Sequence, residues 1–296
     1  MKIDGVFSGG GVKAFAFLGA LEMITENKFE FERVAGTSAG AIVAAFIAAG
    51  YRIDELEKLL EELDLTTLLD SPRITRIIPA SKWFFLYFQM GINKGDKFEQ
   101  WIYYQLAKKK IYTFGDIKKG YLKIVVSDLT LGKLVVIPDD LERVYGINPD
   151  NFPVSKAVRM SAGFPYFFMP KKLKGIGKEK SLMVDGGLLS NFPIWVFDSE
   201  TNKRTRPIIG LKLSDSPERS TPKRIKNALD MLHALFATMK QAHDARYVAK
   251  SEKNNIIFIP VKNVQTTNFM INEETKIKLI NSGRLEAERF LKTWSM

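Results

Sequence analysis

The feature that most restricts the fold is a unit repeated near the N-terminus, in which a short apolar run precedes a glycine-containing turn and an apolar helical stretch. The first unit has its apolar run at Ile3–Phe7, and the second has it at Phe31–Ala35. Short apolar runs bounded by turn residues are typical of buried strands. A strand, a turn and a helix in this order indicate the α/β class of fold.

The remainder of the chain continues the alternation. Further strands are predicted at Tyr121–Ser127, Lys133–Ile137, Leu182–Val184, Pro207–Leu213 and Ile256–Val261, and helices at Val12–Glu26, Ala39–Ala49, 52–62, Pro153–Met160, Lys223–Ser251 and Glu273–Lys292. This alternation predicts a three-layer α/β/α fold with a mainly parallel central sheet. Because 46% of the 296 residues are hydrophobic, the chain can bury a sizeable core.

Composition excludes several kinds of site and partner. The chain has no cysteine, which excludes disulfides, thiolate zinc sites and a cysteine nucleophile. Its net charge of +11 is spread along the sequence and forms no concentrated stripe, which argues against nucleic acid as a partner. The spread charge fits two interpretations equally well, namely weak attraction to an anionic lipid surface and solubility alone.

No segment predicts a membrane span or an export signal. The longest uncharged apolar run, Ala39–Tyr51, is far shorter than the ~20 residues that a spanning helix needs. Asp4 and the segment Ser8–Gly11 interrupt the apolar core that a secretory signal requires. We therefore expect a cytoplasmic protein that is either free or peripheral at a membrane.

A serine lies in the second glycine-containing turn, within the sequence Gly36-Thr37-Ser38-Ala39-Gly40. A serine between a strand and a helix can occupy a strained turn that exposes its hydroxyl. Glycines on both sides allow the strand and helix backbones to approach closely. The helix that follows would supply N–H groups and a positive dipole end to an oxyanion. The other interpretation of these residues is an ordinary strand–helix turn.

The first glycine-containing turn has two interpretations. Its sequence, GGGVKA at residues 9–14, follows a strand and opens a helix, so bare glycine amides can point N–H donors at one oxygen. The same six residues fit the dinucleotide-binding pattern G-x-G-x-x-G/A. Glu26, Glu30 and Glu32 are candidates for the ribose contact that this alternative needs.

A third motif, Asp185-Gly186-Gly187, follows the predicted strand Leu182–Val184. Alone it is equally well explained as an Asp-Gly turn. The two histidines, His233 and His243, lie on one predicted helix and fit packing or surface positions better than a catalytic one. If Ser38 is a nucleophile, a carboxylate is therefore its expected base. An exposed aspartate, with a pKa of about 3.9, is a weak base at neutral pH, so such a dyad requires a pocket that excludes water.

Taken together and in this order, GGGVKA at 9–14, GTSAG at 36–40 and DGG at 185–187 resemble the patatin-like phospholipase family. The segment SAGFPYFFMP at residues 161–170 is also similar to a stretch that precedes the aspartate in that family. The resemblance implies a patatin-like α/β fold and hydrolysis of phospholipid or other lipid esters without a metal or organic cofactor. By position it implies Ser38 as nucleophile, Asp185 as base, and an oxyanion hole lined by Gly9, Gly10 and Gly11, to which the Ala39 amide contributes.

The chain departs from the family pattern at two positions. Lys13 stands where many members have arginine, and Ala14 stands where many have glycine. Alanine is small enough to keep the helix close to the sheet, and lysine keeps the positive charge but loses the two-pronged contact of arginine. These departures bear on affinity and substrate preference more than on the class of reaction.

The resemblance covers roughly residues 3–200 and carries no motif in the last hundred residues. We expect residues 1–200 to form the catalytic domain, with a cap-like insertion at about 64–112, and residues 201–296 to complete the same domain. The insertion is rich in aromatic and apolar residues, namely Trp83-Phe84-Phe85-Leu86-Tyr87-Phe88, Met90, Trp101, Tyr103 and Tyr104. They indicate either a cap at a lipid surface or an ordinary core element. Two further alternatives stay open, a dinucleotide-binding protein and a lipid-binding scaffold without catalysis.

Overall fold

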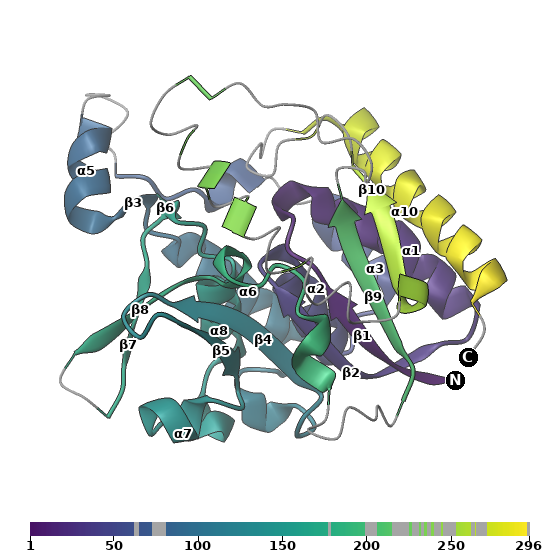
Figure 1. Ribbon diagram of the computed structural model, residues 1–296, viewed down its shortest axis with the longest axis horizontal. Coiled ribbons are helices and arrows are strands. Elements are labelled where there is room, and N and C mark those ends of the chain that lie inside the picture. Colours follow the sequence, from purple (N-terminus) through teal and green to yellow (C-terminus); the bar gives the residue numbers. More distant parts are fainter. Residues whose placement is uncertain are drawn as a thin grey trace.

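The computed structural model describes residues 1–61, 65–72, 81–176, 179–198, 206–214, 253–261 and 271–294, together with residues 225, 226, 231, 234, 235, 238, 239, 244 and 264. In these residues an eight-stranded sheet runs in the order β10-β9-β1-β2-β4-β8-β7, and β5 pairs with β4 (Figure 1). Its strands are β1 (Lys2–Phe7), β2 (Glu30–Thr37), β4 (Leu122–Asp128), β5 (Lys133–Ile137), β7 (Lys171–Lys174), β8 (Lys180–Asp185), β9 (Ile208–Ser214) and β10 (Ile256–Pro260).

The pairing from β10 to β4 is parallel, whereas β5, β7 and β8 are antiparallel to their neighbours. Two short strands, β3 (Gly91–Asn93) and β6 (Tyr166–Phe168), form a separate parallel pair. The predicted α/β fold with a mainly parallel central sheet is confirmed.

Helices connect these strands and cover the sheet (Figure 1). The α-helices are α1 (Phe15–Glu26), α2 (Ala39–Ala48), α3 (Ile53–Glu61), α5 (Ser81–Gln89), α6 (Asp96–Lys108), α7 (Leu141–Tyr145), α8 (Val154–Ser161) and α10 (Glu273–Thr293). The 3₁₀ turns are η1 (Gly11–Ala14), η2 (Leu65–Leu68), η3 (Phe114–Asp116), η4 (Pro149–Asn151), η5 (Gly186–Leu188), η6 (Ile194–Phe197) and η7 (Lys253–Asn255). No helix in the described ranges is both long and apolar enough to cross a bilayer.

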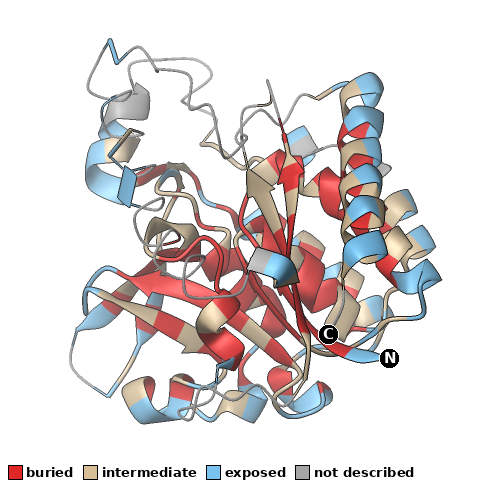
Figure 2. Ribbon diagram, turned by 45° about the vertical axis from the view of Figure 1, so that its right-hand side comes forward, coloured by how far each residue is buried: buried red, intermediate tan, exposed pale blue. Residues whose placement is uncertain are grey.

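The period of a strand divides the β1 side chains between two cores. Ile3 and Phe7 belong to the larger cluster on the side of α1 and α2, whereas Val6 belongs to a smaller cluster with Phe192 and Ile194. Burial is therefore concentrated along the strands, and exposure along the outer faces of the helices (Figure 2).

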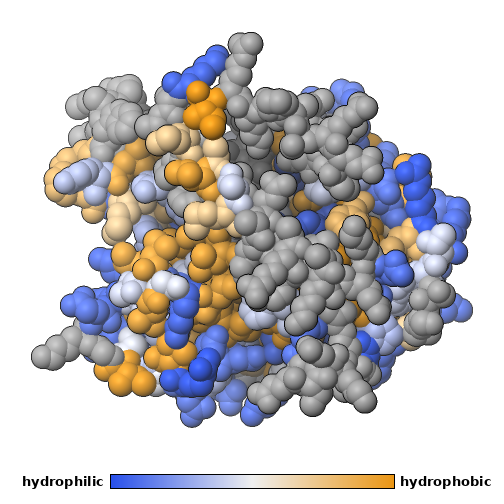
Figure 3. All heavy atoms as spheres, viewed as in Figure 1, coloured by the Kyte–Doolittle hydropathy of each residue, from blue (hydrophilic) through white to orange (hydrophobic). Residues whose placement is uncertain are grey.

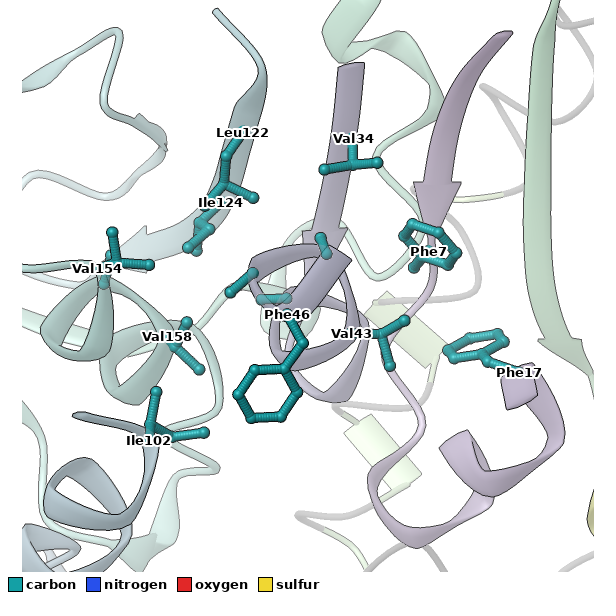
Figure 4. Close-up of a cluster of buried hydrophobic side chains, with 14 of the residues drawn as sticks. Phe7, Phe17, Val34, Val43, Phe46, Ile102, Leu122, Ile124, Val154 and Val158 are labelled. Carbon is teal, nitrogen blue, oxygen red and sulfur yellow. The ribbon is translucent and has the colours of Figure 1, made fainter. Parts of the chain in front are cut away.

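Helix α2 occupies the middle of the larger core because nearly all of its residues are apolar. Figure 4 shows Val43 turned towards Phe17 and Phe7, and Phe46 on the side nearer Val158. Contact on several sides fixes the helix, and with it the turn that precedes its first residue.

The last helix, α10, packs along α1, and both lie at the same side of the molecule (Figure 1). Two glycines allow the backbones to approach closely. A Cβ on Gly283 would lie 1.8 Å from the Ala16 carbonyl oxygen, and one on Gly19 would lie 2.0 Å from the Ile280 carbonyl oxygen. Any larger residue at either position would force the helices apart.

The aromatic segment at 64–112 divides into two parts. Helix α6 contributes to the core, through Phe98, Ile102 and Leu106. Helix α5 projects from the body of the molecule (Figure 1), and its Phe84, Tyr87 and Phe88 are 56%, 80% and 63% exposed. From the sequence, this segment could be either a cap or a core element. In the structure its two helices differ in burial: α6 packs in the core, and α5 exposes three of its aromatic side chains.

Most predicted elements agree with the structure to within a few residues. The helix expected at Val12–Glu26 begins as the 3₁₀ turn Gly11–Ala14 and becomes α-helical at Phe15. Strands β3, β6 and β7 and helices α5, α6 and α7 were not predicted. The helix predicted at Lys223–Ser251, with His233 and His243, lies largely outside the described residues.

Candidate active site

Ser38 forms the sharp turn between β2 and α2. Its backbone is left-handed, with φ 55° and ψ −124°, a conformation that non-glycine residues adopt rarely and that is found at functional sites. The predicted glycines allow this turn because a Cβ on Gly36 would lie 2.2 Å from the Gly40 carbonyl oxygen. A Cβ on Gly40 would lie 2.3 Å from the Phe7 carbonyl oxygen. The sequence GTSAG therefore packs β1, β2 and α2 together behind the serine.

A second serine fixes the strained turn. The Ser38 N–H donates to Ser161 Oγ at 2.9 Å, and the Ser161 hydroxyl donates to the Val125 carbonyl oxygen at 2.7 Å. Ser161 is fully buried at the end of α8. It ties the turn to β4, and so limits the movement of the Ser38 side chain.

Asp185 meets Ser38 although the two are 147 residues apart in sequence. The Ser38 hydroxyl donates to Asp185 Oδ2 at 2.7 Å. The other carboxylate oxygen, Oδ1, accepts the Gly187 N–H at 2.7 Å. Asp185 is the last residue of β8, which pairs with β4 at Val126, and is only 5% exposed. The carboxylate is thus withdrawn from bulk water and has a hydrogen bond on each oxygen.

The turn after Asp185 also needs its glycines. A Cβ on Gly186 would lie 2.2 Å from the Val125 carbonyl oxygen, and one on Gly187 would lie 2.9 Å from Asp185 Oδ1. This close approach explains why the sequence DGG occurs here. The motif is therefore more than an exposed Asp-Gly turn.

The glycine loop after β1 lies against the same serine. A Cβ on Gly9 would lie 3.1 Å from the Ser38 Cβ and 2.4 Å from Asn191 Oδ1, so glycine is the residue that fits here without a shift of its neighbours. Gly10 has φ 178° and ψ 1°, Gly11 is left-handed with φ 56°, and the loop enters η1 at that residue. Lys13 is buried within η1, and Ala14 ends it.

One of the predicted oxyanion-hole residues already has a partner. The Gly9 N–H donates to the Asn191 carbonyl oxygen at 2.8 Å. The Gly9 N–H therefore donates to an acceptor within the protein, so any N–H donors to a substrate oxygen would have to be sought among the other residues of the loop.

The dinucleotide alternative does not fit the arrangement of β1 and β2. The two strands are parallel and in register from Lys2 with Glu30 to Phe7 with Gly36. Glu30 and Glu32 therefore lie at the edge of the sheet opposite to the glycine loop, and Thr37 is on the order of 16 Å further along the strand from Glu32. A ribose contact is expected at the carboxyl end of the second strand, where this chain has Ser38.

Two site residues were not assigned a role from the sequence. Ser161 lies in the segment that resembles the family, but its contact with the Ser38 backbone depends on tertiary structure. Asn191 had no sequence signal apart from closely following the DGG motif. No group of three or more acidic or histidine side chains in the described part of the chain is arranged to hold a metal ion.

The chain is similar to a known family and to several known proteins. The patatin-like phospholipase family matches residues 5–198. An uncharacterized protein of Bacillus subtilis, YqhO, is 50% identical over 295 residues, which is 100% of both chains. The cUMP-AMP-activated phospholipase of Escherichia coli is 27% identical over 197 residues, 62% of this chain and 54% of that one.

Solved structures show the same fold. VipD from Legionella pneumophila aligns over 99% of this chain and 67% of its own, with a TM-score of 0.59 and 18% identity. The type III effector ExoU of Pseudomonas aeruginosa aligns over 98% of this chain and 53% of its own, with a TM-score of 0.50 and 17% identity. With the family match covering more than half of its length, the chain belongs to the patatin-like phospholipase family, whose members are lipid ester hydrolases.

Proposed function

We propose that the protein is a lipid acyl hydrolase in which Ser38 attacks the ester carbonyl and Asp185 accepts the serine proton. The observation that carries this proposal is the 2.7 Å hydrogen bond from the Ser38 hydroxyl to Asp185 Oδ2, made from a left-handed turn. A nucleophile and a base within hydrogen-bond reach are what such a reaction needs. Burial of Asp185 favours its action as a base, because exclusion of water opposes the charged form of a carboxylate.

The oxyanion that forms on attack requires N–H donors close to Ser38. We assign this role to the amides of Gly10 and Gly11 and to the amide of Ala39, which is the first residue of α2. The first N–H groups of a helix have no partner within it and lie at its positive end. The Gly9 amide, which donates to Asn191, fixes the loop in this scheme and is not one of the donors.

The remaining steps follow from the same groups. Protonated Asp185 gives its proton to the departing alcohol oxygen, and an acyl ester remains on Ser38. Asp185 then takes a proton from a water molecule, which attacks the acyl carbon, and the released serine oxygen recovers the proton. The original serine proton therefore leaves with the alcohol, and a proton from water replaces it on Ser38. Both residues return to their starting states, and the fatty acid and the alcohol are the products.

The direct test is the mass of the intact protein after exposure to a lipid-like fluorophosphonate. We expect a single adduct on the wild-type protein and none on Ser38→Ala. A matched control is Ser282→Ala, which removes a part-buried serine on α10; this variant should still be labelled. Labelling of Ser38→Ala, or hydrolysis of a lipid ester by it, would reject the mechanism. A folded wild-type protein with neither labelling nor hydrolysis would favour the scaffold alternative.

We also propose that the protein acts at a lipid surface through α5. Phe84, Tyr87 and Phe88 have the spacing of one helix face, and each is more than half exposed. Figure 3 shows apolar atoms on the part of the molecule that α5 occupies, continuing towards the centre of the same face. An exposed aromatic face of this kind fits the interface between headgroups and acyl chains, and the net charge of +11 favours anionic lipids.

The surface proposal is tested by vesicle sedimentation with the double variant Phe84→Ser and Phe88→Ser. The two aromatic side chains would be buried in the lipid at about 1.5–3 kcal/mol each, so their loss predicts a fall in vesicle affinity of at least about a hundredfold. The matched control is Ile277→Ser with Leu285→Ser, which removes two exposed apolar side chains from α10. Equal affinity of the two double variants would reject the proposal.

The C-terminal third is proposed to belong to the catalytic domain, together with residues 1–200. Two contacts support this assignment. Strand β9 pairs in parallel with β1, directly before the glycine loop, and the Leu213 N–H donates to Ser8 Oγ at 3.0 Å. The boundary at residue 200 would then separate no independent folding unit.

A further inference from the structure

The segment Ser190–Phe192 lies between the glycine loop and the turn that carries Asp185. The Gly9 N–H donates to the Asn191 carbonyl oxygen at 2.8 Å, and the Asn191 side-chain Nδ2 donates to the Gly9 carbonyl oxygen at 3.2 Å. The peptide groups on both sides of Gly9 are therefore fixed by one residue.

The second of these hydrogen bonds sets the direction of a proposed oxyanion donor. The Gly9 carbonyl and the Gly10 N–H belong to one peptide group, which is planar and trans, so the two bonds point in opposite directions. When Asn191 holds the carbonyl on one side, the Gly10 N–H is directed to the other. The orientation of the Gly10 N–H thus depends on a side chain that makes no contact with it.

Asn191 is also in contact with the turn that follows the base. A Cβ on Gly9 would lie 2.4 Å from Asn191 Oδ1, and one on Gly187 would lie 3.0 Å from the same oxygen. The Gly187 N–H in turn donates to Asp185 Oδ1. The Asn191 side chain therefore lies between the two glycine motifs. Gly9 and Gly187 leave room for it because they have no side chain.

Asn191 is held from behind by a buried carboxylate of the C-terminal third. Asp244 is 4% exposed, and its Oδ1 accepts the N–H groups of Asn191 and Phe192, both at 3.1 Å. Its Oδ2 accepts from Lys212 Nζ on β9 at 3.0 Å. A buried carboxylate is stable only when it is paired and hydrogen-bonded, and here its partners are the residues that flank the glycine loop.

We propose that Asn191 is a positioning residue that aims the Gly10 N–H at the oxyanion, and that Asp244 is the residue that holds Asn191 in place. This inference rests on the proposed serine–aspartate mechanism. It gives the C-terminal third a role in the reaction, through Asp244 and its partner Lys212.

The first test compares Asn191→Ala with Asn93→Ala. Asn93 is a matched control, because it is also 4% exposed and its Nδ2 donates to a backbone carbonyl, that of Phe167, at 3.1 Å. Complete loss of one oxyanion donor costs roughly 10²–10³ in kcat, so a donor that is misdirected but present should cost roughly tenfold to hundredfold. We expect this fall for Asn191→Ala on a soluble short-chain ester, with KM within about twofold, and wild-type kcat for Asn93→Ala at a similar loss of melting temperature.

The second test uses Asp244 and stays informative if Asn191→Ala does not fold. In Asp244→Asn the amide oxygen can still accept from the Asn191 and Phe192 N–H groups, although the ion pair with Lys212 is lost. We expect Asp244→Ala to lower kcat and Asp244→Asn to recover most of it. If Asp244 acts only through its ion pair, the two variants will have equal kcat, and this result would overturn the assignment.

Ser38→Ala, assayed in parallel, distinguishes the two proposals. Activity in Ser38→Ala would overturn both the mechanism and this inference. An inactive Ser38→Ala combined with wild-type kcat in Asn191→Ala would leave the mechanism intact and overturn the positioning role alone.

Discussion

Replacing Asp185 with asparagine reverses one hydrogen bond while changing almost nothing in shape. In the native site Oδ1 accepts the Gly187 N–H and Oδ2 accepts the Ser38 hydroxyl, each at 2.7 Å. The asparagine oxygen must take the Oδ1 position, because an NH₂ there would face the Gly187 N–H and leave a buried donor unpaired at about 1–3 kcal/mol. Its NH₂ group then faces Ser38, which becomes the acceptor and has no base.

The expected loss of activity follows from this reversal. A positioned general base contributes roughly 10²–10⁴ in rate, and here the replacement also holds the serine oxygen in the wrong orientation. We therefore expect Asp185→Asn to lower kcat by at least about 10³-fold, equivalent to about 4 kcal/mol of activation free energy. The melting temperature should change little, because the amide satisfies the same neighbours.

The assay is initial-rate hydrolysis of a soluble short-chain aryl ester at neutral pH, with thermal unfolding measured on the same samples. Asp128→Asn is a matched control, since Asp128 is also buried and accepts a hydroxyl, that of Tyr145 at 2.7 Å, together with two backbone N–H groups. This control should retain wild-type kcat. If Asp185→Asn keeps kcat within about tenfold of wild type while Ser38→Ala is inactive, Asp185 is not the base and the reasoning is refuted.

Three further outcomes are expected. Ser161→Ala should lower both stability, by about 1–3 kcal/mol, and kcat, because it leaves the Ser38 N–H without its partner; thermal unfolding and ester hydrolysis measure the two, and an unchanged melting temperature would contradict it. Gly283→Val should destabilise by more than about 1 kcal/mol in urea unfolding, since even its Cβ would lie 1.8 Å from a carbonyl oxygen of α1; wild-type stability would show that the two helices can separate freely. Hydrogen bonds from Lys118 and then Lys2 lower the pKa of Glu32 from 4.5 to about 2, so its contribution to stability is complete above pH 4.5 and is lost as the pH falls towards 2. Glu32→Gln should therefore be less stable than wild type near neutral pH, and the difference should shrink as the pH falls through about 2. A difference that is as large at the acidic end as at neutral pH would exclude this linkage.

Local patterns predicted the elements that pack around the catalytic candidates. The apolar runs that became β1, β2 and β4 are buried on the sheet, and the small apolar residues of α2 fit between neighbouring elements as expected. The helix boundary at Val12 was wrong because the left-handed Gly11 begins a 3₁₀ turn before α1. The order and spacing of glycines indicated a turn, but they carry no information on which kind of helical turn follows.

The elements that were missed have weak local signals. Strand β7 has the sequence KKLK, which looks like a solvent-exposed charge cluster. Only its Leu173 is buried, and the strand lies at the edge of the sheet. Lysines on an edge strand oppose pairing with other chains, so the charge that hid the strand is suited to its position. Strands β3 and β6 are too short for an alternating pattern to be visible.

Long-range contacts account for what the sequence alone did not assign. The pairing of Ser38 with Asp185 was implied by a resemblance, whereas the contacts of Asn191 with Gly9 and Asp244 join three distant parts of the chain. A polar residue in such a bridge has no periodicity and no motif of its own. Its role is recognised only when the partners of its polar atoms are known.

The left-handed backbone at position 38 has a consequence for the chemistry that this site can adopt. A side chain branched at Cβ is strongly disfavoured at a φ of 55° because its second γ atom clashes with the neighbouring peptide groups. Threonine is therefore excluded as a replacement nucleophile, although its hydroxyl has nearly the same reactivity as that of serine. Cysteine, which is unbranched, meets the steric requirement. Between threonine and cysteine, the turn therefore allows only the exchange of the serine oxygen for sulfur.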